Sequence, residues 1–460
     1  MALSSQRDVS TDEARTARHD IINRRVIAWS LWDWGSAAFN AVATTFVFSV
    51  YLTSGLFGDK DEATESLSLG LTVAGILIAL LAPITGQRSD RHNKSRMLLG
   101  VFTFAVVTLM AMMFFVRPDS PLGSTGALWL GIALLGFGNV FFEFASVNYN
   151  AMLNYVSTPK TMGRISGIGW GSGYVGGIVL LLVLYLGLIS DNRFIPIPQD
   201  DGLNIRVAMV IAALWFALSA IPVLLTVKNP HPRDFSGSEH ESIIDSYRLL
   251  WATVKRLAKE APHTLWFLLA SAVFRDGLAG VFTFGAIIAA GTFGFSSGGV
   301  MIFGIAANIV AGIATMIFGM LDDRFGSKAV IILSLISMVV SGLVVFFLHD
   351  GGQKIFWIFG LILCVFVGPA QSASRAFLAR VIPQGREGEV FGLYATTGRA
   401  VSFLAPLMYY QAVQWGKWIE PDAASTQYWG ILGILLILLI GLIMVIPVKG
   451  HRAHLNTLDQ

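Results

Sequence analysis

Long apolar blocks alternate with short polar segments along the 460 residues of the chain. A helix needs roughly 20 apolar residues to cross the hydrocarbon core of a bilayer, which is about 30 Å thick. The pattern contains twelve such blocks and predicts an all-α integral membrane protein with 12 transmembrane helices. The predicted spans cover residues 27–54, 67–86, 97–116, 127–151, 164–189, 205–227, 264–291, 298–320, 328–348, 355–376, 389–414 and 427–447.

The composition agrees with a membrane protein. Charged residues make up only 13% of the chain, whereas soluble domains carry about 25%. The formal net charge is +3 and no basic block is present, so a nucleic-acid partner is not expected. Cys364 is the only cysteine, which excludes disulfides and cysteine-based metal sites. Because the sequence has neither a phosphate-binding glycine loop nor a zinc-binding histidine pair, we expect no enzyme activity, cofactor or metal.

The distribution of Lys and Arg predicts the orientation, because cytoplasmic loops are enriched in these residues. With both termini in the cytoplasm, 23 of the 32 Lys and Arg fall on the inner side and 6 on the outer side. The predicted organisation is a cytoplasmic tail (1–26), a first six-helix half (27–227), a linker (228–263), a second six-helix half (264–447) and a second tail (448–460).

The linker itself predicts an amphipathic helix. Ser238 and Glu241 have the spacing of a capping box, and apolar residues from Ile243 to Ala258 recur on one helical face. Such a helix is suited to the inner membrane surface. A solvated linker helix is the alternative interpretation.

An internal repeat predicts the architecture. Gly86, Asp90 and Arg91 follow the second span, and Gly319, Asp323 and Arg324 follow the eighth at an offset of 233 residues. A second repeated spacing relates the first and seventh spans. Asp33 precedes Phe39 by six residues, and Asp276 precedes Phe282 by six residues. The repeat predicts two six-helix halves in parallel orientation.

The repeated loop resembles the signature of the major facilitator superfamily. In that superfamily the loop acts as a latch that favours the outward-facing state, so the resemblance implies this role for the two Gly-Asp-Arg sets. A narrower resemblance is to its vacuole-effluxer branch, the fungal autophagy-related amino-acid effluxers and their bacterial relatives. The matching segments are 29–39, 149–153, 173–177, 275–277 and 371–406. The resemblance implies a transporter in a prokaryotic cell membrane.

Polar groups inside the predicted spans are the candidate functional residues. An ionised group at the bilayer centre costs about 2.5–3.5 kcal/mol on insertion scales, so it persists where it faces a cavity or a partner. In the superfamily, spans 1, 4, 7 and 10 line the central cavity. The candidates for substrate binding or proton coupling are Asp33, Asn40, Glu143, Asn150, Arg275, Asp276, Gln371, Arg375 and Arg399.

These groups suit a solute with both a positive and a negative pole, such as an amino acid. Carboxylates would bind an amine or carry protons, and the arginines would bind a carboxylate. We expect a monomeric, proton-coupled exporter of small polar solutes that works by alternating access. The alternatives are an exporter of amphiphilic compounds, drugs or lipids, and a non-transporting membrane scaffold.

Three structural interpretations stay open beside the functional ones. Asp33 and Asp276 would pair with Arg275, Arg375 or Arg399 as structural latches between the halves. Arg375 would extend to the cytoplasmic interface. A belt of interfacial tryptophans would account for Trp29, Trp32 and Trp34 as well as a cavity lining does.

Overall fold

The computed structural model describes residues 23–91, 93–190, 193–228, 243–295, 297–382, 386–421 and 426–449. Both predicted tails lie mainly outside this part, and the predicted capping box at Ser238 and Glu241 lies wholly outside it. Within the described part every regular element is a helix, which confirms the predicted all-helical class.

The longer helices correspond to the apolar blocks, apart from α10, which lies in the linker. They are α2 (Arg24–Ala37), α4 (Lys60–Arg91), α5 (Ser95–Met112), α6 (Gly123–Ala151), α8 (Met162–Leu184), α9 (Leu203–Thr226), α10 (Ile243–Glu260), α11 (Pro262–Gly291), α12 (Ser297–Phe325), α13 (Ser327–Phe347), α15 (Leu361–Val381), α16 (Glu387–Val401), α17 (Leu404–Ile419) and α18 (Gly430–Val445). Short elements continue some of them, such as the π-helical η1 (Ala38–Phe46) and α3 (Phe48–Leu52) after α2, α7 (Leu153–Val156) after α6, and α14 (Gln353–Ile355) before α15.

In the described part of the chain, eleven helices are long and apolar enough to cross a membrane. The predicted eleventh span, residues 389–414, is not among them because it is divided into α16 with 15 residues and α17 with 16 residues. Pro406 lies in the first turn of α17. A proline is tolerated there, and in a continuous helix its ring would clash with the carbonyl four residues earlier, which favours a break before it.

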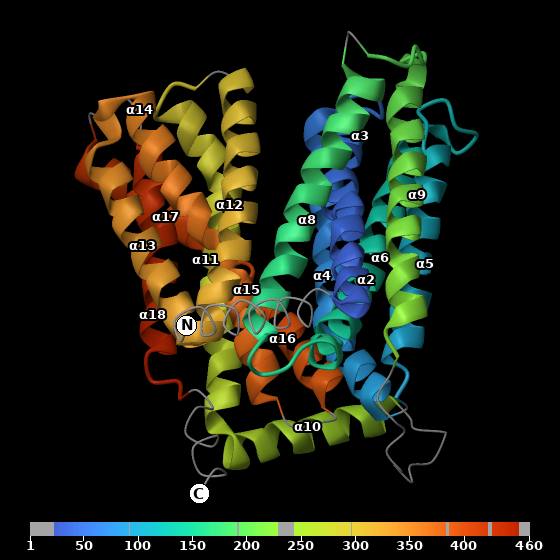
Figure 1. Ribbon diagram of the computed structural model, residues 1–460. Helices are drawn as coiled ribbons and strands as arrows, with labels where there is room; N and C mark the ends of the chain where they lie inside the picture. The colour runs from blue at the N-terminus through green and yellow to red at the C-terminus, as the bar shows by residue number, and fades with distance from the viewer. Residues whose placement is uncertain are drawn as a thin grey trace, which may run out of the picture.

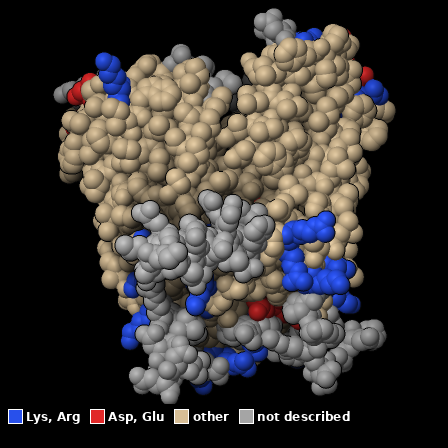
Figure 2. All heavy atoms as spheres, viewed as in Figure 1, with Lys and Arg blue, Asp and Glu red and all other residues tan. Residues whose placement is uncertain are grey.

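The helices form two groups, which we call the N-terminal bundle (α2 to α9) and the C-terminal bundle (α11 to α18) (Figure 1). The bundles diverge at one end and approach each other at the end that carries α10 (Figure 1). Two helix pairs, α8 with α12 and α4 with α16, form the main contact between the bundles. On the face drawn in Figure 2, charged side chains lie toward the two ends of the molecule and leave a broad uncharged band between them.

Helix α10 lies across the closed ends of both bundles, in the segment in which the sequence predicts an amphipathic helix (Figure 1). The Tyr247 hydroxyl donates a hydrogen bond to the carbonyl of Leu80 in α4, at 2.8 Å. Leu257 is buried, whereas Trp251 is 61% exposed beside Lys255. The helix therefore joins the bundles and leaves an aromatic and basic side accessible.

Candidate functional site

Arg375 extends from α15 of the C-terminal bundle into the N-terminal bundle. Its Nη1 lies 3.4 Å from the Asp33 carboxylate and donates to Oδ1 of Asn150 at 3.2 Å. Its Nε donates to the Ser166 hydroxyl at 3.0 Å, and Nη2 donates to the Ser166 carbonyl at 2.6 Å. Arg375 is 3% exposed. The structure therefore contradicts an extension to the membrane interface, because the guanidinium points into the protein.

Three aromatic rings surround the same guanidinium. Its carbon lies 5.0 Å from the ring centre of Trp29, 5.8 Å from that of Tyr149 and 5.6 Å from that of Trp170. Rings at this range attract a cation through the negative charge of their faces. The Tyr149 hydroxyl also donates to Asp33 at 3.2 Å. We call these rings, with Asp33, Asn150 and Ser166, the cation cage.

Trp29 and Trp32 are core residues, which contradicts the interfacial belt for these two. Both rings stack on Tyr149, with centres 4.4 Å and 4.3 Å away. Their indole nitrogens donate to the Tyr149 carbonyl and the Thr103 hydroxyl, so the buried polar atoms are satisfied. Trp34 points elsewhere and stacks on Trp215.

A second ion pair crosses between the bundles. Nη2 of Arg399 in α16 lies 3.4 Å from the carboxylate of Glu143 in α6. The side chains are 39% and 21% exposed, so this pair is far more accessible than that of Arg375 and Asp33. The prediction that Arg399 pairs with Asp276 or Asp33 was wrong. The carboxylate that lies opposite Arg399 belongs to another helix of the N-terminal bundle.

Asp276 instead caps α17 at the break in the eleventh apolar block. Its carboxylate accepts the backbone N–H of Ala405 at 2.6 Å and is 8% exposed. The N–H groups of a first helical turn lack a partner within the helix, and a carboxylate there also interacts well with the helix dipole. The structural interpretation of Asp276 as the partner of an arginine was therefore wrong.

Arg275, the neighbour of Asp276 in α11, binds the other piece of the divided span. Its guanidinium carbon lies 3.7 Å from the ring centre of Tyr394 in α16, and Nη1 donates to the Tyr394 carbonyl at 3.2 Å. The two neighbours thus have separate partners, as expected for consecutive helical residues that point about 100° apart.

The neutral candidates differ in how close they lie to Arg375. Asn150 belongs to the cation cage, and Gln371 lies half-buried one helical turn before Arg375. Asn40 lies exposed in η1 and is not one of the hydrogen-bond partners of Arg375 described above. Sequence reasoning missed Ser166 and Trp170, because a serine and a tryptophan in a glycine-rich span give no signal of a charged partner.

The two aspartates of the repeated motif cap helices of the opposite bundle. Asp90, at the end of α4, accepts the N–H groups of Gly388 at 2.9 Å and Glu389 at 2.8 Å in the first turn of α16. Asp323, near the end of α12, accepts the N–H groups of Gly163 at 2.8 Å and Arg164 at 3.1 Å in the first turn of α8. We call these contacts the Asp90 cap and the Asp323 cap.

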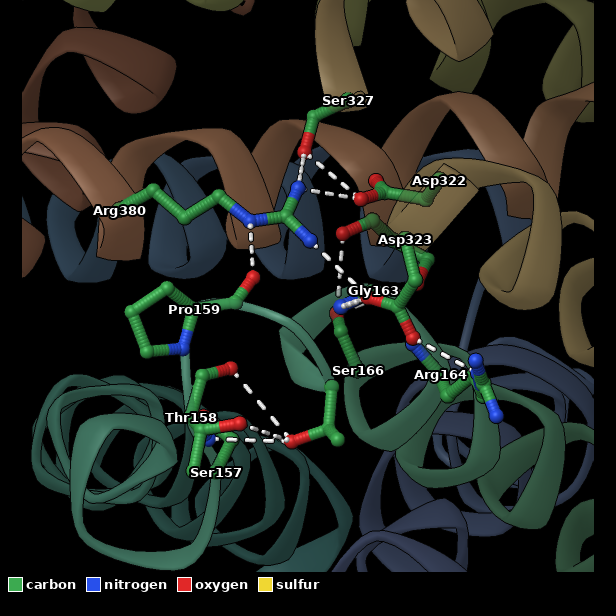
Figure 3. A network of polar contacts seen from close by, with 12 residues as sticks. Ser157, Thr158, Pro159, Gly163, Arg164, Ser166, Asp322, Asp323, Ser327 and Arg380 are labelled. Carbon is green, nitrogen blue, oxygen red and sulfur yellow. Dashed lines mark hydrogen bonds and ion pairs between the residues drawn. The ribbon is translucent and has the colours of Figure 1, made fainter. Parts of the chain in front are cut away.

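Further ionic contacts surround the Asp323 cap (Figure 3). Arg380 of α15 contacts both Asp322 and Asp323, and its Nε donates to the Pro159 carbonyl at 3.3 Å. Arg164 lies 3.0 Å from Asp323, although its side chain is 40% exposed. Arg324 of the predicted latch lies over the Phe325 ring, and Arg91 ends α4 with its side chain outside the described part.

Glycines allow the helices to meet at both caps. A Cβ atom on Gly86 would overlap the carbonyl oxygen of Gly388, and one on Gly388 would lie 2.7 Å from that of Gly86. Similarly, a Cβ atom on Gly319 would lie 2.8 Å from the carbonyl oxygen of Gly163. The glycines of the repeated motif therefore permit backbone contact between the bundles, which any larger residue would prevent.

A separate pocket lies within the C-terminal bundle. Apolar side chains from α11, α12, α13, α15 and α18 line it, including Phe303, Leu363 and Cys364, and the glycines Gly285 and Gly304 widen it. It offers no charged partner to a polar solute. Among the described residues, no group of three or more His, Cys, Asp and Glu side chains could hold a metal ion.

Known proteins resemble the chain at two levels of sequence similarity. The model of the family described as "Vacuole effluxer Atg22 like" matches residues 55–457. An uncharacterized transporter of the major facilitator type from Bacillus subtilis, YxiO, is 27% identical over 385 residues, with 83% of this chain and 86% of the relative covered. Autophagy-related protein 22-1 of Neosartorya fischeri is 25% identical over 269 residues, or 54% of this chain. The match covers 43% of that fungal protein, so the chain spans less than half of its length.

Solved structures share the fold over nearly the whole chain. The proton:xylose symporter XylE superposes with a TM-score of 0.70 at 12% identity and covers 96% of this chain and 98% of its own. A bacterial homologue of the iron transporter ferroportin, in an outward-facing state, superposes with a TM-score of 0.66 at 15% identity and covers 92% and 98%. From the family match, the sequence relatives and the shared fold, the chain belongs to the vacuole effluxer family within the major facilitator superfamily of transporters.

Proposed function

We propose that the chain is a secondary active transporter that moves small polar solutes, such as amino acids, by alternating access. In this proposal α16 and α17 together form the eleventh of twelve membrane spans. Residues 27–227 and 264–447 are two six-helix halves in parallel orientation, the linker 228–263 joins them, and both termini are cytoplasmic. The excess of Lys and Arg on one side supports this orientation.

The observation that carries the proposal is the pair of ionic contacts between the bundles. Arg375 with Asp33, and Arg399 with Glu143, each join one bundle to the other. Separation of the bundles at this end would break both pairs, and loss of the buried pair of Arg375 and Asp33 is costly unless new partners replace the old ones. A solute with an ammonium and a carboxylate group supplies both kinds of partner. Its binding would therefore lower the cost of the conformational change.

Coupling, direction and location complete the proposal. We propose proton coupling, because Asp33, Glu143 and Asp276 are carboxylates that can carry a proton inside the predicted spans. Export is supported by the name of the matching family, vacuole effluxer. We further propose a monomer in a prokaryotic cell membrane, in which the Asp90 and Asp323 caps favour the outward-facing state.

Flux into proteoliposomes under an imposed pH gradient tests the proposal. We expect gradient-driven movement of radiolabelled amino acids by the unmodified chain and a loss of that movement in Asp33→Asn, which removes the charge with little change in shape. Asp350→Asn is the matched control, because the Asp350 side chain is 94% exposed and lies outside the ion pairs between the bundles. Normal, pH-dependent flux in Asp33→Asn would remove Asp33 from the mechanism.

The apolar pocket favours a second candidate, an exporter of amphiphilic compounds or lipids. The side chains that line the pocket are apolar, and such cavities accept apolar rather than polar guests. Dye efflux by the same proteoliposomes, without flux of amino acids, would support this candidate. If no solute moves, the remaining alternative is a membrane scaffold with the same fold.

A further inference from the structure

We propose that the cation cage is the binding site for a guanidinium or ammonium group of the transported solute, and that Arg375 occupies this site as a built-in substitute. This inference deepens the proposed function, on which it rests, by naming a substrate class: cationic solutes that carry a guanidinium or primary amine. The argument starts from the atoms that the N-terminal bundle presents to the guanidinium.

Every polar contact that the N-terminal bundle makes with Arg375 comes from an acceptor. The acceptors are the carboxylate of Asp33 in α2, the side-chain oxygen of Asn150 in α6, and the hydroxyl and carbonyl of Ser166 in α8. Three helices thus converge on one donor group. A site of acceptors with one negative charge is complementary to a cation that donates several hydrogen bonds.

The aromatic walls reinforce this selectivity. Trp29, Tyr149 and Trp170 all lie within 6 Å of the guanidinium carbon, the range in which ring faces attract cations. Aromatic rings of this kind surround ammonium ligands in other binding sites. A neutral group of the same shape would gain neither the ring attraction nor the ionic contact with Asp33.

The cage is held in shape by contacts within the N-terminal bundle. Trp29 stacks on Tyr149 with an angle of 8° between the rings, and its indole nitrogen donates to the Tyr149 carbonyl. Asp33 accepts from the Tyr149 hydroxyl and, at 3.5 Å, from the Ser36 hydroxyl. None of these contacts involves Arg375. The carboxylate of Asp33 and the rings of Trp29 and Tyr149 are therefore held in place independently of the arginine.

Arg375 belongs to the opposite bundle, so it fills the cation cage only while the two bundles are in contact. Alternating access separates the bundles at the end where Arg375 enters, and α15 then withdraws the guanidinium from the cage. Asp33 is left without its partner, and a cation from solution would take the place of the Arg375 guanidinium. When the bundles close again, Arg375 competes for the same acceptors and displaces the solute. The tethered arginine thus serves as a release device for a cationic substrate.

Binding of methylguanidinium, with the neutral methylurea of similar shape as the comparison, tests this inference on purified full-length protein. We expect Arg375→Ala to bind methylguanidinium saturably and at least about tenfold more tightly than methylurea, because the cation alone gains the ring and carboxylate contacts. Addition of Asp33→Asn should abolish this preference. Arg375→Lys, which keeps a tethered cation in the cage, should not bind the probe. Equal binding of the two probes, or no binding, in folded Arg375→Ala would overturn the inference.

A second measurement leaves Arg375 intact, in case its removal prevents folding. The variant Asp90→Ala/Asp323→Ala lacks both caps and should spend more time with the bundles separated, so methylguanidinium should bind to it more tightly than to the unmodified protein. An unchanged affinity, in a variant whose thiol labelling at the bundle interface shows that the bundles separate more often, would contradict the cage. The binding measurements and the flux assay can fail independently of each other. Amino-acid flux without cation binding overturns this inference alone, whereas cation binding without any flux overturns the proposed transport alone.

Discussion

Loss of the Asp90 carboxylate is expected to favour separation of the bundles at the end that carries α10. In the described structure this carboxylate accepts two backbone N–H groups at the start of α16, and both acceptor distances are below 3 Å. Asp90→Ala removes both acceptors and the negative charge from the helix N-terminus. A separated state has already lost these contacts, so the substitution penalises the closed state alone.

The magnitude follows from the contacts. Replacement of an Asp cap by Ala costs about 0.5–2 kcal/mol, and a charged acceptor at a partly buried helix N-terminus lies at the upper end of this range. About 2 kcal/mol changes the ratio of the two states roughly 30-fold at 25 °C. Asp323→Ala should have an effect of similar size, because its two N–H contacts also cross between the bundles, whereas its contact with Arg380 lies within the C-terminal bundle and persists in both states. Arg164 adds little, since a 40% exposed side chain is screened by solvent.

Thiol accessibility provides the assay. Ser372 in α15 is 3% exposed and its hydroxyl donates to Ser166 across the bundle boundary, so Ser372→Cys places a nearly isosteric thiol in the closed interface. Cys364→Ala removes the single natural cysteine. On this background, the rate of labelling by a membrane-impermeant maleimide should rise about 30-fold in Asp90→Ala if exchange between the states is fast.

The control retains the cap. Asn is as good a capping residue as Asp but offers one acceptor oxygen without the charge, so Asp90→Asn should raise the labelling rate less than Asp90→Ala does. Asp350→Ala, at a 94% exposed side chain, should leave the rate unchanged. If both Asp90→Ala and Asp323→Ala label at the rate of the parent, the caps do not bias the conformational equilibrium and the reasoning fails.

Three further substitutions test other parts of the structure. Arg399→Gln should weaken the binding of carboxylate-bearing solutes at least about tenfold more than that of neutral amphiphiles, and equal losses in binding isotherms would make Arg399 structural. Asp276→Ala should lower the free energy of unfolding by about 1–2 kcal/mol through loss of the α17 cap, with a smaller loss in Asp276→Asn; identical melting curves for all three proteins would refute the cap. Gly86→Ala should raise labelling at Ser372→Cys, because the added methyl group overlaps Gly388. Gly75→Ala is the control in the same helix and should leave labelling unchanged, because a methyl group there would meet no neighbouring atom within 4 Å.

Much of the helical pattern was predictable, because each long helix carries its own apolar block. The motif aspartates were also found from the sequence, since Asp90 and Asp323 recur at one offset. The partners of the charged groups were harder to predict. Arg399 and Glu143 are 256 residues apart, and no periodicity connects two helices of different bundles. Asp33 was named among the expected partners of Arg375, but its aromatic surroundings were not foreseen.

The divided eleventh span shows a different limit of sequence patterns. Its apolar block is continuous, so the pattern predicts one helix where the structure has α16 and α17. Pro406 was a weak signal, because a proline disrupts the hydrogen bonds of the turn before it, yet Pro83, Pro222 and Pro369 lie inside continuous helices. The sequence could not show that Asp276, 129 residues earlier, supplies the acceptor for Ala405. That contact exists only after α11 and α17 pack together.

The reciprocal arrangement of the caps has a consequence for a chain cut between its bundles. Each separated half would carry one aspartate without its helix and one helix N-terminus without its aspartate, because Asp90 caps α16 and Asp323 caps α8. The two fragments are therefore complementary at two places, because each carries a carboxylate that fits a helix N-terminus of the other. Coexpressed halves of this protein should find each other in a membrane, and a fragment from an unrelated bundle without the matching glycine and aspartate would not fit either position.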